Sequence, residues 1–153
     1  DPMQAARRLL AVASEDVGLA DPMALPTAVA ALQAVQNLGL PEGRLALTQA
    51  ALYLAAAPKS NSVHAAIQAA SREVREGVDQ AVPLHLRNRS SGTAAELGHG
   101  YIYAHDTKEG VAPIQCLPDG LIGRTFYRPG PRGFEQKVAE RLAEADRLRR
   151  VKP

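Results

Sequence analysis

The chain contains 153 residues, which is enough for one ordinary domain with a hydrophobic core of its own. Hydrophobic residues make up 46% and exclude a disordered chain, while the low aromatic content of 4% favours packed helices over a sheet. The net charge of +2 is too small to indicate nucleic-acid binding by itself, and the single cysteine, Cys116, excludes an internal disulfide. No apolar run approaches the roughly 20 residues that cross a bilayer, so we expect no membrane partner.

Hydrophobic spacing predicts four helices in the first half of the chain. Gly18 is expected to end the first helix, and Asp21 followed by Pro22 is a typical start for the second, with a kink or restart at Pro26. Pro58 is expected to end the third helix. The four helices are predicted over residues 3–17, 21–38, 41–57 and 60–76.

The third of these helices is apolar on nearly every side between Leu45 and Ala57, which predicts a central position in the core. The fourth carries an apolar stripe at helical spacing. That stripe consists of Val63, Ile67, Ala70 and Val74.

Residues 77–132 hold many prolines and glycines and are predicted to be an irregular arm, with a short helix possible near 93–97. A clear helical pattern returns over residues 134–149. The sequence therefore predicts an all-α fold in one domain, residues 1–153, with a helical core over about 3–76. An irregular segment of this length usually serves an interface or a function.

The sequence offers few candidates for catalytic, metal-binding or phosphate-binding residues. Gly98-His99-Gly100 lacks the following Lys-Ser/Thr of a phosphate-binding loop, and His105 and Asp106 are adjacent and point apart. A metal site of His99, His105 and Cys116 lacks the paired spacing of zinc motifs, and Cys116 has an apolar setting unlike that of a catalytic thiolate. We expect no catalytic, metal or cofactor-binding residue in this chain.

Two groups of charged residues are candidates for other roles. Arg72, Arg75, Arg87 and Arg89 could contact DNA phosphates if the fold gathers them, although solvated helix faces are the simpler explanation. Glu15 and Asp16 fall at the end of the first predicted helix, where the helix dipole disfavours negative charge. We therefore expect an arginine from elsewhere in the domain, or from a neighbouring subunit, to compensate them.

Five sequence blocks together resemble the C-terminal domain of the replication-associated recombination protein A family, the bacterial RarA/MgsA AAA+ ATPases related to the eukaryotic Werner-helicase-interacting protein. They occur in the family's order and span nearly the whole chain. The blocks are Ala13-Ser14-Glu15-Asp16-Val17-Gly18 with Ala20-Asp21-Pro22; Ala57-Pro58-Lys59-Ser60-Asn61; Val82-Pro83-Leu84-His85-Leu86-Arg87-Asn88; Tyr101-Ile102-Tyr103-Ala104-His105-Asp106; and Phe126-Tyr127-Arg128-Pro129 with Gly133-Phe134-Glu135.

The resemblance implies a helical domain similar to the clamp-loader collar, which forms a homotetramer. It also implies an upstream AAA+ module that would bind ATP and Mg²⁺. The chain opens with Asp-Pro, so we expect it to be a fragment without that module. The parent would be a DNA-stimulated ATPase of the bacterial cytoplasm and nucleoid, acting at stalled replication forks and contacting single-stranded-DNA-binding protein.

Most of the few aromatic residues lie in or beside the irregular arm. Tyr101, Tyr103, Phe126 and Tyr127 are candidate contacts between subunits, because aromatic side chains are enriched in interface cores. They could equally pin the arm onto the helices of the same chain. The alternative function for the whole domain is a helical DNA-binding module that uses the arginine group, and an enzyme is a distant third.

Overall fold

The computed structural model describes residues 1–77, 81–87 and 101–150. It contains five α-helices, and the described residues form no strand, which confirms the all-α prediction. The chain divides into two compact units: unit 1 is Asp1–Gln68 with Phe126–Ala139, and unit 2 is Ala69–Thr125 with Glu140–Pro153. The helices are α1 (Pro2–Val12), α2 (Ala24–Leu38), α3 (Gly43–Ala56), α4 (Ser62–Arg75) and α5 (Glu135–Arg150).

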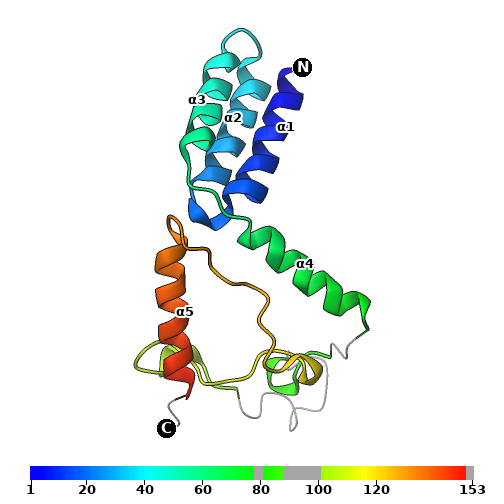
Figure 1. Ribbon diagram of the computed structural model, residues 1–153, viewed down its shortest axis with the longest axis vertical. Coiled ribbons are helices and arrows are strands. Elements are labelled where there is room, and N and C mark those ends of the chain that lie inside the picture. The colour runs from blue at the N-terminus through cyan, green and yellow to red at the C-terminus, as the bar shows by residue number, and fades with distance from the viewer. Residues whose placement is uncertain (78–80, 88–100, 151–153) are drawn as a thin grey trace. The chain divides into compact units, whose positions relative to one another are not determined.

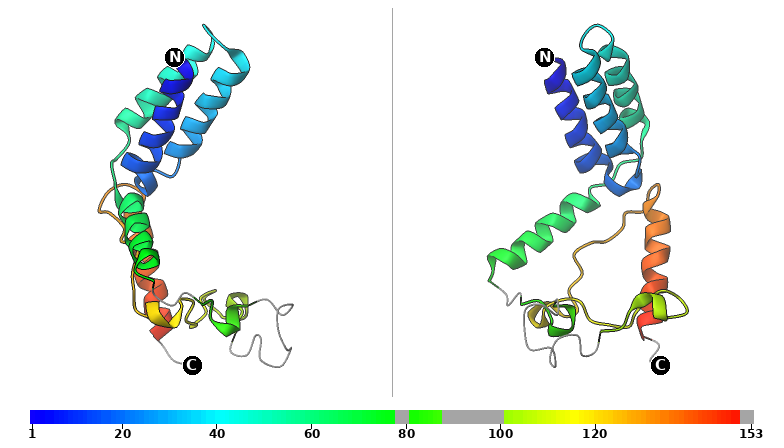
Figure 2. Two further views of the ribbon diagram at one scale, coloured as in Figure 1. Left: turned by 90° about the vertical axis from the view of Figure 1, so that its right-hand side faces the viewer. Right: turned by 180° about the vertical axis from the view of Figure 1, so that it is seen from behind.

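Helices α1, α2 and α3 of unit 1 run side by side and pack on one another (Figures 1 and 2). Most of the side chains buried between them are alanine or valine, and Leu54 is the largest apolar side chain that is almost fully buried. Small side chains let helix axes approach closely, so a chain with few aromatic residues still forms a dry core. The central cluster consists of Ala13, Val17, Ala24, Ala28 and Leu54.

The first helical run does not end as one regular helix. After Val12 it widens into a π-helical turn over Ala13–Val17 and finishes as a 3-10 turn over Gly18–Ala20. The predicted helical run to residue 17 is thus confirmed, but its last turn is π-helical. Turns of this kind often occur at functional sites.

Helix α2 starts later than the sequence predicted. The Asp21 carboxylate accepts a hydrogen bond from the Met23 N–H at 3.0 Å and so stabilises a turn before the helix. The helix proper begins at Ala24, which puts Pro26 in its first turn. A first-turn N–H has no partner within the helix, so the proline costs no hydrogen bond and the expected kink is not needed.

The prediction that the third helix would be central is wrong. Only Gly43, Ala50 and Leu54 of α3 are buried, whereas Leu45 is 80% exposed and Leu52 is 67% exposed. An apolar helix surface that the domain's own core does not cover is unusual for a monomer. The sequence pattern could not tell whether the same chain would bury this surface.

The predicted arm is irregular wherever the structure describes it, with only three 3-10 turns at Leu84–Leu86, Ala104–Asp106 and Asp119–Leu121. The possible short helix near 93–97 lies outside the described residues. Helix α5 follows at the predicted place.

Candidate assembly and binding surfaces

The four aromatic residues predicted at an interface do not come together on one unit. Tyr101 and Tyr103 belong to unit 2 and are 51% and 53% exposed, whereas Phe126 and Tyr127 belong to unit 1 and are half-buried. Tyr103 also lies near His105, with ring centroids 5.0 Å apart. A role for these rings between subunits stays a prediction.

Tyr127 takes part in a buried polar network inside unit 1. Its hydroxyl donates to Glu135 Oε1 at 2.8 Å, and the Ser62 hydroxyl donates to the same oxygen. Glu135 is fully buried although it is the first residue of α5. The network ties the start of α5 to the start of α4, so Tyr127 anchors the domain internally.

The pKa values follow from this arrangement. Burial raises the pKa of Glu135, but the surrounding donors, among them the Ser62 and Tyr127 hydroxyls that bond its Oε1, outweigh burial, and the pKa is lowered. Burial and the hydrogen bond to the Glu135 carboxylate raise the pKa of Tyr127 to about 12. At neutral pH the pair therefore consists of an ionised carboxylate and a neutral phenol.

A second contact fixes the same end of α5. The Phe134 N–H donates to the Ala20 carbonyl oxygen at 2.8 Å, across more than one hundred residues of chain. Gly133, with φ of +59°, leaves no room there for a side chain, because a Cβ would lie far inside contact distance of that carbonyl. The block around Gly133 therefore has a packing role.

Glu15 and Asp16, the charged pair at the end of the first helical run, have neighbours from the start of α4 and from the segment before it. His64 Nδ1 lies 4.0 Å from Glu15 Oε1. Asp16 lines a hollow that Arg128 and Arg132 also line, and its backbone carbonyl accepts from the Ser60 N–H at 2.8 Å. Neither arginine forms a direct ion pair with Asp16 among the described residues, so compensation of this carboxylate by an arginine stays a prediction.

That hollow, named here the basic pocket, has a volume of about 700 Å³ and lies wholly in unit 1. The sequence analysis did not predict this pocket, because Lys59 and Asp16 lie far along the chain from Arg128 and Arg132. Three of the five sequence blocks described above contribute to it. Its main polar residues are Asp16, Lys59, Ser60, Asn61, Arg128 and Arg132.

The arginines predicted to contact DNA are only partly placed. Arg72 and Arg75 are exposed on the last turn of α4. The Arg87 Nε donates to the Val82 carbonyl oxygen at 2.7 Å, and Arg89 lies outside the described residues. Their common role in DNA contact stays a prediction.

The exposed side of α3 forms an uncharged stripe, named here the α3 face. Its residues repeat at intervals of three and four, so they share one side of the helix. Helix α2 has no charged residue at all and α3 has only Arg44, whereas α5 carries nine charged residues in 16 positions. The α3 face consists of Leu45, Thr48, Gln49, Leu52, Ala55 and Ala56, all exposed.

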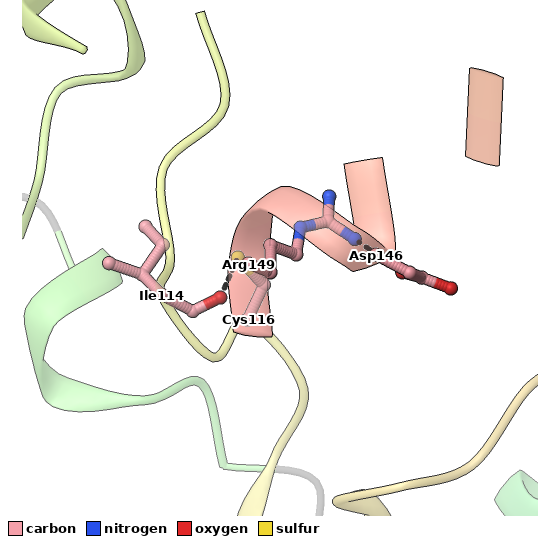
Figure 3. A network of polar contacts seen from close by, with 4 residues as sticks. All are labelled: Ile114, Cys116, Asp146 and Arg149. Atoms are coloured by element: carbon pink, nitrogen blue, oxygen red, sulfur yellow. Dashed lines mark hydrogen bonds and ion pairs between the residues drawn. The ribbon is translucent and has the colours of Figure 1, made fainter. Parts of the chain in front are cut away.

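Unit 2 contains a more apolar hollow of about 670 Å³, lined by Tyr101, Ile102, Cys116 and Arg149 among others. Cys116 is exposed, with Sγ 3.9 Å from the Ile114 carbonyl oxygen, and Arg149 pairs with Asp146 at 3.3 Å (Figure 3). Within residues 1–77, 81–87 and 101–150, no hydrogen bond or ion pair joins this thiol to a histidine, and His85 instead bonds the Gln115 carbonyl oxygen at 2.7 Å.

In residues 1–77, 81–87 and 101–150, no three side chains of His, Cys, Asp or Glu are placed to share a metal ion. His99 lies outside these ranges. None of the described helices has the length and apolar character needed to cross a bilayer.

Comparison with known proteins identifies the family. A family model described as the C terminal of MgsA AAA+ ATPases matches residues 1–146. The chain is 48% identical over 145 residues to the replication-associated recombination protein A of Coxiella burnetii, covering 93% of this chain and 33% of that protein. It is 45% identical over 146 residues to the protein of the same name from Escherichia coli K12, with 94% and 33% covered.

A third relative is an uncharacterised AAA domain-containing protein of Mycobacterium tuberculosis, 47% identical over 153 residues, with 99% of this chain and 33% of that protein covered. The chain thus spans about a third of the length of these relatives. The matched region covers almost the whole chain and includes the blocks that form the basic pocket and the Glu135 network. The chain therefore belongs to the family of MgsA AAA+ ATPase C-terminal domains.

Proposed function

We propose that this chain is the homotetramerisation domain of a AAA+ ATPase that maintains and rescues stalled replication forks. The observation that carries the proposal is the α3 face, which exposes Leu45 and Leu52 on a helix with a single charged residue. An interface core is depleted of charge and contains apolar side chains packed around small ones. Membership of the MgsA family supports the connection to a AAA+ parent.

A second copy of the chain is the occupant that best fits this face. The face bears no charge, so two copies can meet in a symmetric contact without like-charge repulsion. Ala55 and Ala56 at one end allow close approach of a second helix. Four copies of the face, one helix from each chain, would assemble four chains if they packed together around a closed symmetry axis.

The remaining parts of the proposal concern the parent protein. Its upstream module would bind ATP and Mg²⁺ and carry the catalysis, with no cofactor held by the present chain. Its partners would be DNA and single-stranded-DNA-binding protein, in the bacterial cytoplasm and at the nucleoid. The name of the Coxiella burnetii and Escherichia coli relatives, replication-associated recombination protein A, supports this role.

Multi-angle light scattering of the purified chain tests the assembly. We expect the wild type to have four times the chain mass of 16.3 kDa and a Leu45→Glu/Leu52→Glu variant to be monomeric. Both side chains are mostly exposed, so the variant should keep its helical circular dichroism spectrum. Buried charges without partners would oppose association by several kcal/mol, on the order of 3–5.

The matched control is Ile67→Glu/Val74→Glu, which places the same two charges on exposed apolar positions of α4, 63% and 60% exposed. It should leave the mass unchanged. A monomeric wild type would contradict the assembly function itself. A tetrameric Leu45→Glu/Leu52→Glu variant would contradict only the assignment to α3 and would favour Tyr101 and Tyr103 as the contact.

A further inference from the structure

The basic pocket has an excess of positive charge that the assembly function does not use. Lys59, Arg128 and Arg132 line it against one carboxylate, Asp16. The buried Glu135 lies behind its wall, where hydroxyl donors hold it ionised. Even with Glu135 included, three cations face two carboxylates.

Two of the cations are held in place by the backbone. The Lys59 ammonium donates to the Leu54 and Ala57 carbonyl oxygens at 2.6 and 2.7 Å, at the end of α3. The Arg132 Nη1 donates to the Lys59 carbonyl oxygen at 3.1 Å. Each side chain keeps further N–H donors beyond these bonds, since ammonium has three and guanidinium has five.

Arg128 differs from these two residues. It is exposed at the pocket, and no carboxylate of the described residues forms an ion pair with it. Ser60 and Asn61 add a hydroxyl and an amide to the same hollow. A guanidinium with free donors beside neutral donors is a typical setting for a phosphate oxygen.

We propose that the basic pocket binds a phosphate group of a nucleic-acid strand. The carboxylates limit the excess positive charge, which suits the single charge of a phosphodiester better than the double charge of a phosphate monoester. The other lining side chains, Val12, Ala65 and Pro131, offer no aromatic surface on which a base could stack. The contact would therefore position a strand without reading its sequence.

Fluorescence anisotropy with a labelled single-stranded oligonucleotide tests the proposal on the complete chain. We expect Arg128→Gln to weaken binding about tenfold, as for the loss of one charged hydrogen bond. The slope of log K against log salt concentration should fall in magnitude by about 0.7. Asp16→Asn should tighten binding, because it removes the opposing charge and leaves the Asp16 carbonyl contact with Ser60 intact.

The matched control is Arg44→Gln, an exposed arginine near the other end of α3, about 20 Å from the pocket end of the helix. It removes the same charge and should leave binding unchanged. Equal weakening by Arg128→Gln and Arg44→Gln, or no tightening by Asp16→Asn, would overturn the site.

A titration with inorganic phosphate distinguishes a free phosphate ion from a nucleic-acid strand as the ligand of the basic pocket. Isothermal titration with phosphate alone should show no binding at concentrations where the oligonucleotide saturates. Tight binding of phosphate without binding of the oligonucleotide would overturn the assignment to a strand. Light scattering of Arg128→Gln should give the wild-type mass, which keeps this result independent of the assembly test.

Discussion

Gly133 sets the approach of α5 to the end of the first helical run. A Cβ at this position would overlap the Ala20 carbonyl oxygen and come within 2.8 Å of Pro58 Cγ. We expect Gly133→Ala to destabilise the chain by about 3 kcal/mol or more in urea unfolding, because the Phe134–Ala20 hydrogen bond cannot form without a backbone shift.

The control for this substitution is Gly39→Ala. Gly39 also has a positive φ of 70°, but nothing lies within 4 Å of a Cβ placed there. Gly39→Ala should therefore lower the free energy of unfolding only by the backbone strain, about 1–2 kcal/mol. If Gly133→Ala and Gly39→Ala lowered the free energy of unfolding equally, close packing at Gly133 would contribute nothing to stability.

The Tyr127–Glu135 pair predicts how stability depends on pH. The pKa of Tyr127 is raised from 10.0 to about 12 in the folded chain, so its stabilisation is complete below pH 10 and is lost as the pH rises towards 12. We expect the free energy of unfolding to fall less steeply across this window in Tyr127→Phe than in the wild type. If the curves of unfolding free energy against pH were parallel for Tyr127→Phe and the wild type, the prediction would be contradicted.

Glu135 acts in the opposite pH range. Its pKa is lowered below 4.5, so its contribution to stability is present above pH 4.5 and is lost as the pH falls below that value.

Tyr53, whose hydroxyl donates to Asp21 at 2.7 Å, also has a raised pKa. Only the difference between Tyr127→Phe and the wild type therefore isolates the Tyr127 contribution.

Helix boundaries were largely predictable because local signals set them. Gly18, with a positive φ, ends the π-helical turn before the final 3-10 turn, and Pro58 follows the end of α3, as their backbone preferences require. The π-helical turn over Ala13–Val17 was not predictable, because apolar spacing is nearly the same for both helix types over one turn. The start of α2 shifted because Asp21 caps a turn and not the helix itself.

The exposure of α3 shows a limit of prediction from hydrophobic patterns. Periodicity identifies which residues avoid water, but it does not say whether the same chain or another covers them. The helix was therefore predicted as a central element, while the structure leaves Leu45 and Leu52 uncovered. The absence of charge along α2 and α3 was the available signal for the surface that we propose as the assembly contact.

The basic pocket could not be found from the sequence. Arg132 lies 73 positions after Lys59, and the packing of residues 126–139 against residues 1–68 within unit 1 brings the two together. The arginines that do cluster in sequence, such as Arg72 and Arg75, instead lie on an exposed helix end. Proximity in the chain was the wrong guide to proximity in space.

For the whole molecule, assembly should couple stability to concentration. If only folded chains associate, a tenfold increase in protein concentration stabilises the fold by about 1 kcal/mol per chain, or roughly 2–4 °C in Tm. Differential scanning calorimetry at several concentrations measures this shift. The Leu45→Glu/Leu52→Glu variant should have the same Tm at every protein concentration. A wild-type Tm that did not change with concentration would argue against assembly coupled to folding.

Unit 1 is built from two separate stretches of chain, residues 1–68 and 126–139, closed by the contacts of Phe134 with Ala20 and of Glu135 with Ser62. In topological terms, residues 69–125 are an insertion between the two stretches. Doubling the length of a flexible insertion adds only about 0.6 kcal/mol to the entropy of closing it. The family could therefore lengthen, shorten or replace this segment during evolution while keeping the helical bundle and its pocket intact.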